Sequence, residues 1–292
     1  MTHFNNMNNA VVWPNTGKTN IAATVEQTVH YLRKIGVHVY MPEFAEDLAC
    51  EGVEVCSEYT CLRNANFAVV LGGDGTILAM ARKAAEARTP IIGINIGHLG
   101  FMSELDLSEL HMLSYIVDGK YQIDSRMMLD IEVIRDGLTV FHDVALNEAI
   151  IKTGSIFRIA SIDVVADCTP VCSLHADGVI ISTPTGTTAY AFAAGGPIVE
   201  PTAENLIVVP LCAHGLANRP YVFAQDREIT IRPTSQHDGH LIVSADGREG
   251  FMLNIGDRVI IRKSRKITRL IRVKSQSFYY VLDQKLSGGF SN

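Results

Sequence analysis

The chain has 292 residues, of which 47% are hydrophobic and 19% charged, a composition typical of a globular protein with room for two domains. Its formal net charge of −6 argues against a general nucleic-acid binder, which would carry a basic domain. The polar first ten residues do not resemble a signal peptide, and no apolar run approaches the roughly 20 residues that span a bilayer. We therefore expect a cytoplasmic protein without membrane contacts.

The six cysteines contain no CxxC pair, which argues against a zinc site. We expect all six to be free thiols in a reducing compartment. The sequence suggests no residues as ligands of a protein-held metal.

The first 120 residues alternate between strand and helix patterns. Apolar residues recur at helical spacing from residue 21 to residue 35, and Gly36 follows where a helix usually ends. This alternation predicts a parallel sheet covered by helices, with ligands bound beyond the carboxyl ends of the strands. The expected strands are residues 10–13, 37–40, 67–71 and 91–94, and the expected helices are residues 21–35, 76–87 and 107–117.

From about residue 121 the pattern changes to short β-rich runs separated by turn signals. Only residues 187–194 suggest a helix here, and a short one. We therefore expect an α/β, Rossmann-like domain at residues 1–124 and an all-β sandwich domain at residues 125–274. The clearest expected strands are residues 159–165, 206–209, 229–232 and 259–262.

The glycine-rich turn Gly72-Gly73-Asp74-Gly75-Thr76 stands between a buried strand and the start of a helix. Glycines let a polyanion approach the backbone, and a helix start offers unpaired N–H groups, so we expect ATP phosphates at Gly72, Gly73, Gly75 and Thr76. The spacing is not that of a Walker A loop. Asp74 is unusual in a phosphate site, and we expect it to bind a sugar hydroxyl or accept its proton. A plain Asp-Gly turn would not need three glycines.

Asn147-Glu148 interrupts an apolar stretch. Adjacent side chains on a strand face opposite ways, so one of the two is expected to point inward and to need a partner. The alternative is an edge strand with both side chains in water, and the residues alone leave these two readings open.

The run from Ser182 to Thr188 contains five hydroxyl residues with proline and glycine among them. This composition suits neither a strand nor a helix and favours a loop that binds a ligand, although a turn capping a helix at Thr187 is the structural alternative. By themselves, His214, Arg219-Pro220 and the turn Asp246-Gly247-Arg248 are more typical of structural or solvated residues.

Together these residues resemble the NAD kinase family, whose members phosphorylate NAD to NADP. The glycine turn alone also resembles that of phosphofructokinases and of lipid kinases of the diacylglycerol and sphingosine type. The Asn-Glu pair and the Ser-Thr-Pro-Thr-Gly run are more specific to the NAD kinase family. The matching motifs are Gly72-Gly73-Asp74-Gly75-Thr76, Gly97-His98-Leu99-Gly100-Phe101, Asn147-Glu148, Asp177-Gly178, the run from Ser182 to Tyr190, Ala194-Gly195-Gly196-Pro197, and His214 with Asn218-Arg219-Pro220.

The resemblance implies an active site in the crevice between an α/β domain and a β-sandwich, with residues 275–292 completing the first domain. It implies Asp74 as proton acceptor, Mg²⁺ arriving with ATP, and a homodimer or homotetramer. Ala193 stands where many members have serine. The NAD-binding positions implied are Asp74, Gly75, Phe101, Asn147, Glu148, Arg158, His175, Asp177, Thr188, Ala189, Tyr190, Ala193 and Arg248.

We therefore expect an enzyme that transfers the γ-phosphoryl group of ATP to the 2′-hydroxyl of the adenosine ribose of NAD. Polyphosphate as the donor and NADH as the acceptor stay open. Two other functions remain: a lipid kinase of the diacylglycerol or sphingosine type, and a non-catalytic NAD(P)-binding sensor. No amphipathic membrane helix supports the first, and the intact Asp74 argues against the second.

Overall fold

The computed structural model of the chain describes residues 8–97, 100–154, 159–214, 219–234, 241–275 and 278–287. The chain divides into two compact units, and each is described by itself. Unit 1 comprises Met1–Ser125 with Thr268–Asn292, and unit 2 comprises Arg126–Ile267.

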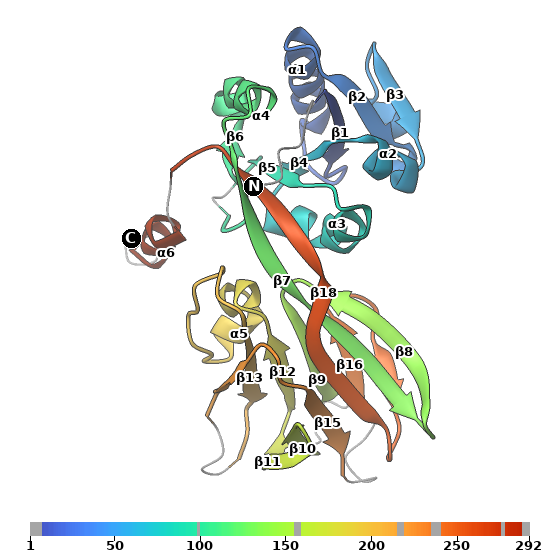
Figure 1. Cartoon of the computed structure of the whole chain (residues 1–292), viewed down its shortest axis with the longest axis vertical. Coiled ribbons are helices and arrows are strands. Elements are labelled where there is room, and N and C mark those ends of the chain that lie inside the picture. Colours follow the sequence, from blue (N-terminus) through green and yellow to red (C-terminus); the bar gives the residue numbers. More distant parts are fainter. Residues whose placement is uncertain are drawn as a thin grey trace. The chain divides into compact units, whose positions relative to one another are not determined.

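Unit 1 is built on a parallel sheet in the order β3-β2-β1-β4-β5 (Figure 1). Its inner strand β4, between β1 and β5, is buried along its whole length, as an apolar run covered on both faces should be. The register pairs Gly72, the last residue of β4, with Asn95, the last residue of β5, so the loops after these strands leave the sheet side by side. The bounds are β1 Asn9–Pro14, β2 His38–Pro42, β3 Val53–Cys56, β4 Phe67–Gly72, β5 Ile91–Asn95 and the short β6 Leu105–Asp106.

Helices pack on both faces of this sheet. One face contacts α1, whose buried side chains recur at helical spacing, and the other contacts α2 and α3. The expected strands at residues 10–13, 67–71 and 91–94 and the helices that begin near residues 21 and 76 are confirmed. The bounds are α1 Ile21–Lys34, η1 Glu43–Leu48, α2 Glu58–Asn64, α3 Asp74–Ala87, η2 Leu107–Leu113 and α4 Ser114–Val117, where η marks a 3₁₀ helix.

Two expectations for unit 1 need correction. The single helix expected at residues 107–117 is a 3₁₀ helix followed by one short α-helix, and it starts from a capping box between Asp106 and Glu109. Cys56 and Cys61 form a disulfide, so these two cysteines are not the expected free thiols. Ser57 caps α2 and turns the chain so that the two Cα atoms lie 5.9 Å apart. Cys50, Cys168, Cys172 and Cys212 are free.

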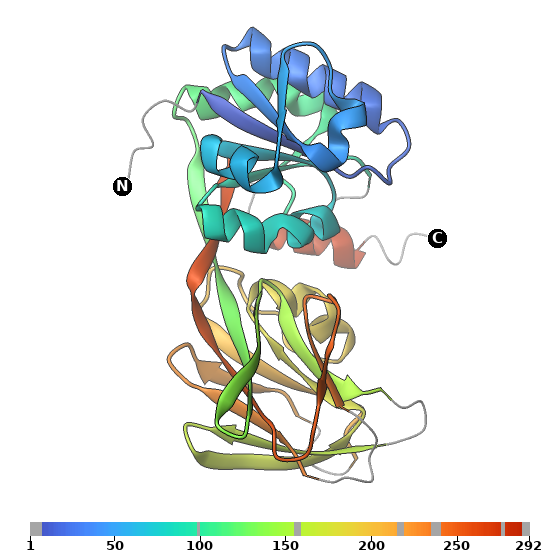
Figure 2. The same cartoon turned by 90° about the vertical axis from the view of Figure 1, so that its right-hand side faces the viewer.

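Unit 2 consists of two antiparallel layers (Figure 2). The side chains between the layers form an apolar core. The first layer has the order β14-β13-β12-β9-β16-β17, and the second contains β11, β10, β15 and β18 with the β7–β8 pair. The bounds are β7 Gln122–Arg135, β8 Leu138–Ala145, β9 Glu148–Thr153, β10 Ala160–Ala166, β11 Thr169–Ala176, β12 Gly178–Ser182, β13 Asn205–Leu211, β14 Tyr221–Ala224, β15 Ile229–Pro233, β16 Leu241–Ala245, β17 Phe251–Leu253 and β18 Arg258–Arg272.

The expected combination of a Rossmann-like α/β fold and a β-sandwich is confirmed. The helix expected at residues 187–194 is instead a 3₁₀ turn η3, Thr185–Thr188, and a short helix α5, Tyr190–Ala193. Ala189 separates them because its backbone angles, φ −105° and ψ −130°, are not helical.

The last part of the chain returns to unit 1. β18 is long enough to pair with β15 in unit 2 and, at Leu270, with Ile91 of β5 in unit 1. It is followed by α6, Phe278–Ser287. Within the described ranges, none of the helices combines the length and apolar character that crossing a membrane would require.

Candidate functional site

Asp74 is the first residue of α3 and follows directly from the end of β4 through Gly73. Its carboxylate accepts two backbone N–H groups from the loop after β5: Phe101 donates to Oδ2 at 2.7 Å and Met102 donates to Oδ1 at 3.0 Å. Each oxygen has two lone pairs, and each uses one in these bonds. The half-buried carboxylate is therefore fixed in direction and keeps acceptor capacity for a hydroxyl group.

Gly100 makes this arrangement possible. A Cβ atom at Gly100 would lie 2.0 Å from Oδ1 of Asp74, so a larger residue would push the loop or the carboxylate away. Gly72 is likewise packed, because a Cβ atom there would lie 2.2 Å from Oγ1 of Thr76, which accepts a hydrogen bond from Asn15 at 3.1 Å. At Gly73 and Gly75 no described atom lies within 4 Å of a Cβ position. Of the expected phosphate positions, these two therefore have open space beside them.

The loop that holds Asp74 is itself anchored by the returning end of the chain. Arg272 donates to the carbonyl oxygen of Met102 at 3.1 Å and pairs with Glu104 and Asp124, each at 3.1 Å. Glu104 also accepts the N–H groups of Val273 and Lys274 at 2.8 and 2.7 Å. A mostly buried ionic network thus fixes the backbone next to the two N–H donors of Asp74.

The ring of Phe101 lies against α6. Its centroid is 5.9 Å from that of Phe278, and the Lys285 ammonium stands 4.3 Å above its face. Phe101 therefore uses its backbone on Asp74 and its side chain on the carboxyl-terminal helix.

Asn147 and Glu148 are 7% and 6% exposed, so both side chains are buried. The edge-strand alternative is wrong, because β9 lies between β12 and β16 in its sheet. The chain passes from one sheet of unit 2 to the other here: β8 ends at Ala145 and β9 begins at Glu148. Strand alternation does not apply across such a crossing, which explains how neighbouring residues both face inward.

Two atoms of this pair lack a partner among the described residues, namely Oδ1 of Asn147 and Oε2 of Glu148. A buried polar atom without a partner is costly, and a ligand or water usually supplies one. Burial, and secondarily the nearby Asp246 carboxylate, raises the pKa of Glu148 to about 8. Near neutral pH Glu148 is therefore a protonated acid that can donate as well as accept.

The hydroxyl-rich run packs against Asn147-Glu148. Thr183 Oγ1 donates to the carbonyl oxygen of Leu146 at 2.6 Å, and the Thr183 N–H donates to that of Asn147 at 2.8 Å. A Cβ atom at Gly186 would lie 2.2 Å from the Asn147 carbonyl oxygen, so only glycine fits there. Four side chains of the run are buried, and each makes a hydrogen bond within unit 2: Ser182, Thr183, Thr185 and Thr187.

Most hydroxyl groups of the run therefore shape the loop. The residues that face outward follow them: Thr188 and Ala189 are half-buried, and Tyr190 and Ala193 are exposed.

The turn Asp246-Gly247-Arg248 joins β16 and β17 and holds the crossing at residues 146–148. Asp246 accepts the N–H groups of Leu146, Asn147 and Glu148 at 2.8, 2.8 and 3.1 Å. Arg248 donates to the carbonyl oxygen of Val144 at 2.5 Å and pairs with Asp143 at 3.0 Å. Sequence reasoning did not propose Asp246 as a site residue, because its only local signal is an Asp-Gly turn.

The remaining expected positions differ in exposure and contacts. His175 on β11 and Asp177, which precedes β12, are both exposed. Nδ1 of His175 lies 3.2 Å from the Ser161 hydroxyl, and the backbone of Asp177 is fixed by Leu211 and Thr153. Arg158 lies outside the described residues, as do His98, Leu99 and Asn218 of the matching motifs.

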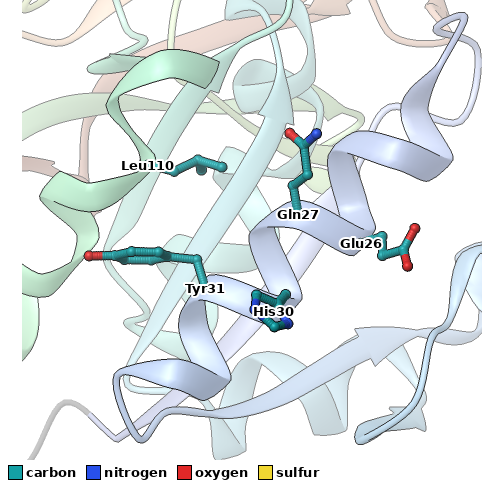
Figure 3. Close-up of a pocket in the computed structure, with 5 residues that line it drawn as sticks. All are labelled: Glu26, Gln27, His30, Tyr31 and Leu110. Atoms are coloured by element: carbon teal, nitrogen blue, oxygen red, sulfur yellow. The ribbon is translucent and has the colours of Figure 1, made fainter.

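A surface pocket of about 410 Å³ lies between α1 and η2 in unit 1 (Figure 3). Glu26, Gln27, His30, Tyr31 and Leu110 line it, and none of these is a candidate site residue. The Tyr31 hydroxyl is already bonded to the carbonyl oxygen of His111 at 2.8 Å.

The donor set does not fit a metal held by the protein alone. The described residues contain no cluster of three or more histidine, cysteine or acidic side chains suited to a metal ion. At the glycine turn Asp74 already accepts two N–H groups.

Comparison with known proteins assigns the chain to a family. The model described as the ATP-NAD kinase N-terminal domain matches residues 11–121, and that of the C-terminal domain matches residues 146–273. The NAD kinase of Desulforamulus reducens is 36% identical over 287 residues, which cover 96% of this chain and 97% of that protein. The NAD kinase of Caldanaerobacter subterraneus subsp. tengcongensis is 38% identical over 280 residues, covering 94% and 98%.

Two solved structures share the fold. Yeast NADH kinase complexed with NADH has a TM-score of 0.87 and 22% identity, covering 99% of this chain and 90% of that one. An NAD kinase from Archaeoglobus fulgidus in complex with ATP has a TM-score of 0.71 and 23% identity, covering 96% and 98%. Both family models and the identity over nearly the full length agree: the chain belongs to the ATP-NAD kinase family.

Proposed function

We propose that this chain transfers the γ-phosphoryl group of ATP to the 2′-hydroxyl of the adenosine ribose of NAD, giving NADP and ADP. The bond that forms joins the ribose 2′-oxygen to the γ-phosphorus, and the bond that breaks joins that phosphorus to the β–γ bridging oxygen. The hydroxyl proton goes to Asp74. The observation that carries the proposal is the Asp74 carboxylate, held by two N–H groups beside a glycine turn with open space.

Asp74 would work mainly by positioning the hydroxyl. Phosphoryl transfer passes through a loose transition state in most analyses, so little proton transfer is needed before the phosphorus begins to move. A carboxylate fixed by Phe101 and Met102 accepts the hydroxyl hydrogen bond in one direction and takes the proton late in the step.

The ATP phosphates would bind at the glycine turn. Gly73 and Gly75 leave the backbone open, and the first turn of α3 offers N–H groups at the positive end of the helix dipole. Gly72 and Thr76 support this turn from inside. Mg²⁺ enters as part of the MgATP substrate and offsets the charge that Asp74 would otherwise repel.

The dinucleotide would bind at the crossing in unit 2. The unpartnered Asn147 Oδ1 suits an amino donor such as that of adenine, and Glu148 suits ribose hydroxyls because its protonated form can donate and accept. Exposed Asp177 and His175 and the outward-facing residues 188–190 and 193 extend this surface. Arg248 is committed to Asp143 and Val144, so we assign it mainly to support, and Arg158 and Phe101 stay predicted contacts.

The proposal includes the cytoplasm as location and a homodimer or homotetramer as the working form. Polyphosphate as donor and NADH as acceptor are alternatives that the same assay addresses by exchanging one substrate.

The test is to incubate the purified chain with NAD and MgATP and to measure NADP with an NADP-specific dehydrogenase. NADP formation that requires both substrates supports the proposal. Absence of NADP, together with NAD binding in calorimetry, would favour the non-catalytic sensor. Phosphorylation of diacylglycerol or sphingosine in place of NAD would favour the lipid kinase.

A further inference from the structure

Asp246 is a buried carboxylate that does not belong to the expected contacts with either nucleotide. Its side chain is 2% exposed, and it accepts N–H groups from three consecutive residues, Leu146, Asn147 and Glu148. The contact is reciprocal, because the Asp246 N–H donates to the Glu148 carbonyl oxygen at 3.0 Å. Four hydrogen bonds therefore join one residue to the segment that carries the Asn-Glu pair.

These bonds replace a missing strand ladder. Leu146 and Asn147 lie between β8 and β9, where the chain changes sheets and no neighbouring strand pairs with it. Buried N–H groups need acceptors, and here one carboxylate supplies them all. The carbonyl oxygens of Leu146 and Asn147 accept hydrogen bonds from Thr183. The N–H groups of the segment are therefore bound by Asp246 and its carbonyl oxygens by Thr183.

Arg248, in the same turn, holds the end of β8 just before this segment. Arg248 binds Asp143 and the Val144 carbonyl oxygen, and its guanidinium lies 3.6 Å from Asp246. Among the described residues, the charged group that acts on Glu148 is Asp246, and Arg248 pairs in turn with Asp246 and Asp143.

The two buried acids, Asp246 and Glu148, differ in how well their surroundings stabilise a negative charge. Burial raises the pKa of both Asp246 and Glu148, but only Asp246 has three N–H donors and a guanidinium to stabilise its charge. Asp246 therefore carries the negative charge, and Glu148 keeps its proton near neutral pH.

We propose that Asp246 is a positioning residue for dinucleotide binding, which fixes the backbone of residues 146–148 and so directs the Asn147 and Glu148 side chains toward NAD. This inference rests on the proposed function of the Asn-Glu pair. It assigns Asp246 no contact with substrate and no part in the phosphoryl transfer step.

The test is Asp246→Asn in the full-length chain. The amide keeps the shape but presents an NH₂ group where an N–H group now donates, and it loses the charge. The expected result is an increase of about 10-fold or more in KM for NAD, since hydrogen bonds to a charged acceptor are lost, with kcat and KM for ATP near the wild-type values. Calorimetry with NAD alone should show the same loss of affinity.

Asp257→Asn is the matched control. Asp257 is also a buried aspartate of unit 2: its side chain is 1% exposed, it accepts the Asn254 N–H at 2.8 Å, and it pairs with Arg135 at 2.8 Å. It holds the turn before β18 rather than the Asn-Glu segment. Its amide variant should lose stability and keep the wild-type KM for NAD.

A pH profile separates positioning from general destabilisation. In the wild type, KM for NAD should change across about pH 8, where Glu148 titrates. In Asp246→Asn this change should move to lower pH, because the neighbouring negative charge is gone. If the amide variant does not fold, Asp246→Glu keeps the charge at a shifted position and should still raise KM for NAD while sparing kcat.

An unchanged affinity for NAD in Asp246→Asn, or the same change in the Asp257→Asn control, would overturn the inference while the proposed function stands. A wild-type chain that neither binds NAD nor forms NADP would overturn both.

Discussion

Asp74 and Asp246 use the same local device in the two units of the molecule. Each is followed by a glycine, and each accepts N–H groups from consecutive residues of a distant loop. Asp74 has two donors and stands half-buried at a helix start, whereas Asp246 has three donors, an arginine beside it, and a side chain that is only 2% exposed. Asp74 therefore keeps acceptor capacity for a ligand, and Asp246 uses its capacity inside the protein.

The comparison shows that an acid followed by glycine does not reveal its role by itself. Burial and the number of internal donors decide whether the carboxylate is available for chemistry or serves as a support. If this distinction is right, changes around Asp74 should act on turnover, and changes around the Asn-Glu segment should act on NAD binding.

The largest effect is expected for Asp74→Asn. The amide cannot take the hydroxyl proton, and one of its two groups would face an N–H donor. Turnover should fall by roughly 10²- to 10⁴-fold, the usual contribution of a general base. Binding of NAD, measured by calorimetry, should stay close to that of the wild type. A kcat near the wild-type value would show that Asp74 is not the proton acceptor.

The second prediction concerns the close approach that positions Asp74. Gly100→Ala places a Cβ atom 2.0 Å from Asp74 Oδ1, which forces the loop or the carboxylate to move. Because small misplacements of a catalytic group are costly, kcat should fall by about 10²-fold, with little change in NAD affinity. Gly17→Ala is the control, since its Cβ atom would find its nearest neighbour at an ordinary 3.4 Å. Equal kinetics in the two variants would contradict the prediction.

The equivalent change in unit 2 should have the opposite kinetic signature. Gly186→Ala places a Cβ atom 2.2 Å from the Asn147 carbonyl oxygen. Overpacking of this kind costs about 1–3 kcal/mol of stability, and the displaced segment should raise KM for NAD more than it lowers kcat. Chemical denaturation and steady-state kinetics measure both. A variant that loses kcat with an unchanged KM for NAD would remove the distinction between the two regions.

The smallest expected effect is on the pH dependence of stability. The pKa of Glu148 is about 8 in the folded chain against a usual value of 4.5. Between these values the folded chain holds a proton that the unfolded chain has lost, so the free energy of unfolding falls as pH rises. From about pH 5.5 to about pH 7.5 the wild type should lose roughly 1 kcal/mol per pH unit more than Glu148→Gln.

Urea unfolding of both proteins across that range measures this slope. Parallel curves for the wild type and the glutamine variant would mean that Glu148 is ionised when folded.

Elements with a strong local pattern could be predicted from the sequence. The apolar run of β4, the helical spacing in α1 and the glycines after β4 each fix one local conformation, and all three were expected. The segment from residue 43 to residue 64 was missed, because η1 and α2 are short and β3 is only half-buried, which leaves little periodicity to detect. The helix expected at residues 107–117 was wrong because apolar spacing does not separate a 3₁₀ helix from an α-helix.

The candidate site was predictable only in part. The sequence by itself indicated the two fold classes and the glycine turn with Asp74, because short-range spacing and residue type carry these signals. It left open whether Asn147-Glu148 is buried, which the position of β9 inside its sheet decided. Only the tertiary structure decided which acid stays available and which is buried, because Asp246 lies 99 residues from Asn147 in the chain. Burial and hydrogen-bond partners depend on segments brought together by folding, and no local pattern around Asp246 records them.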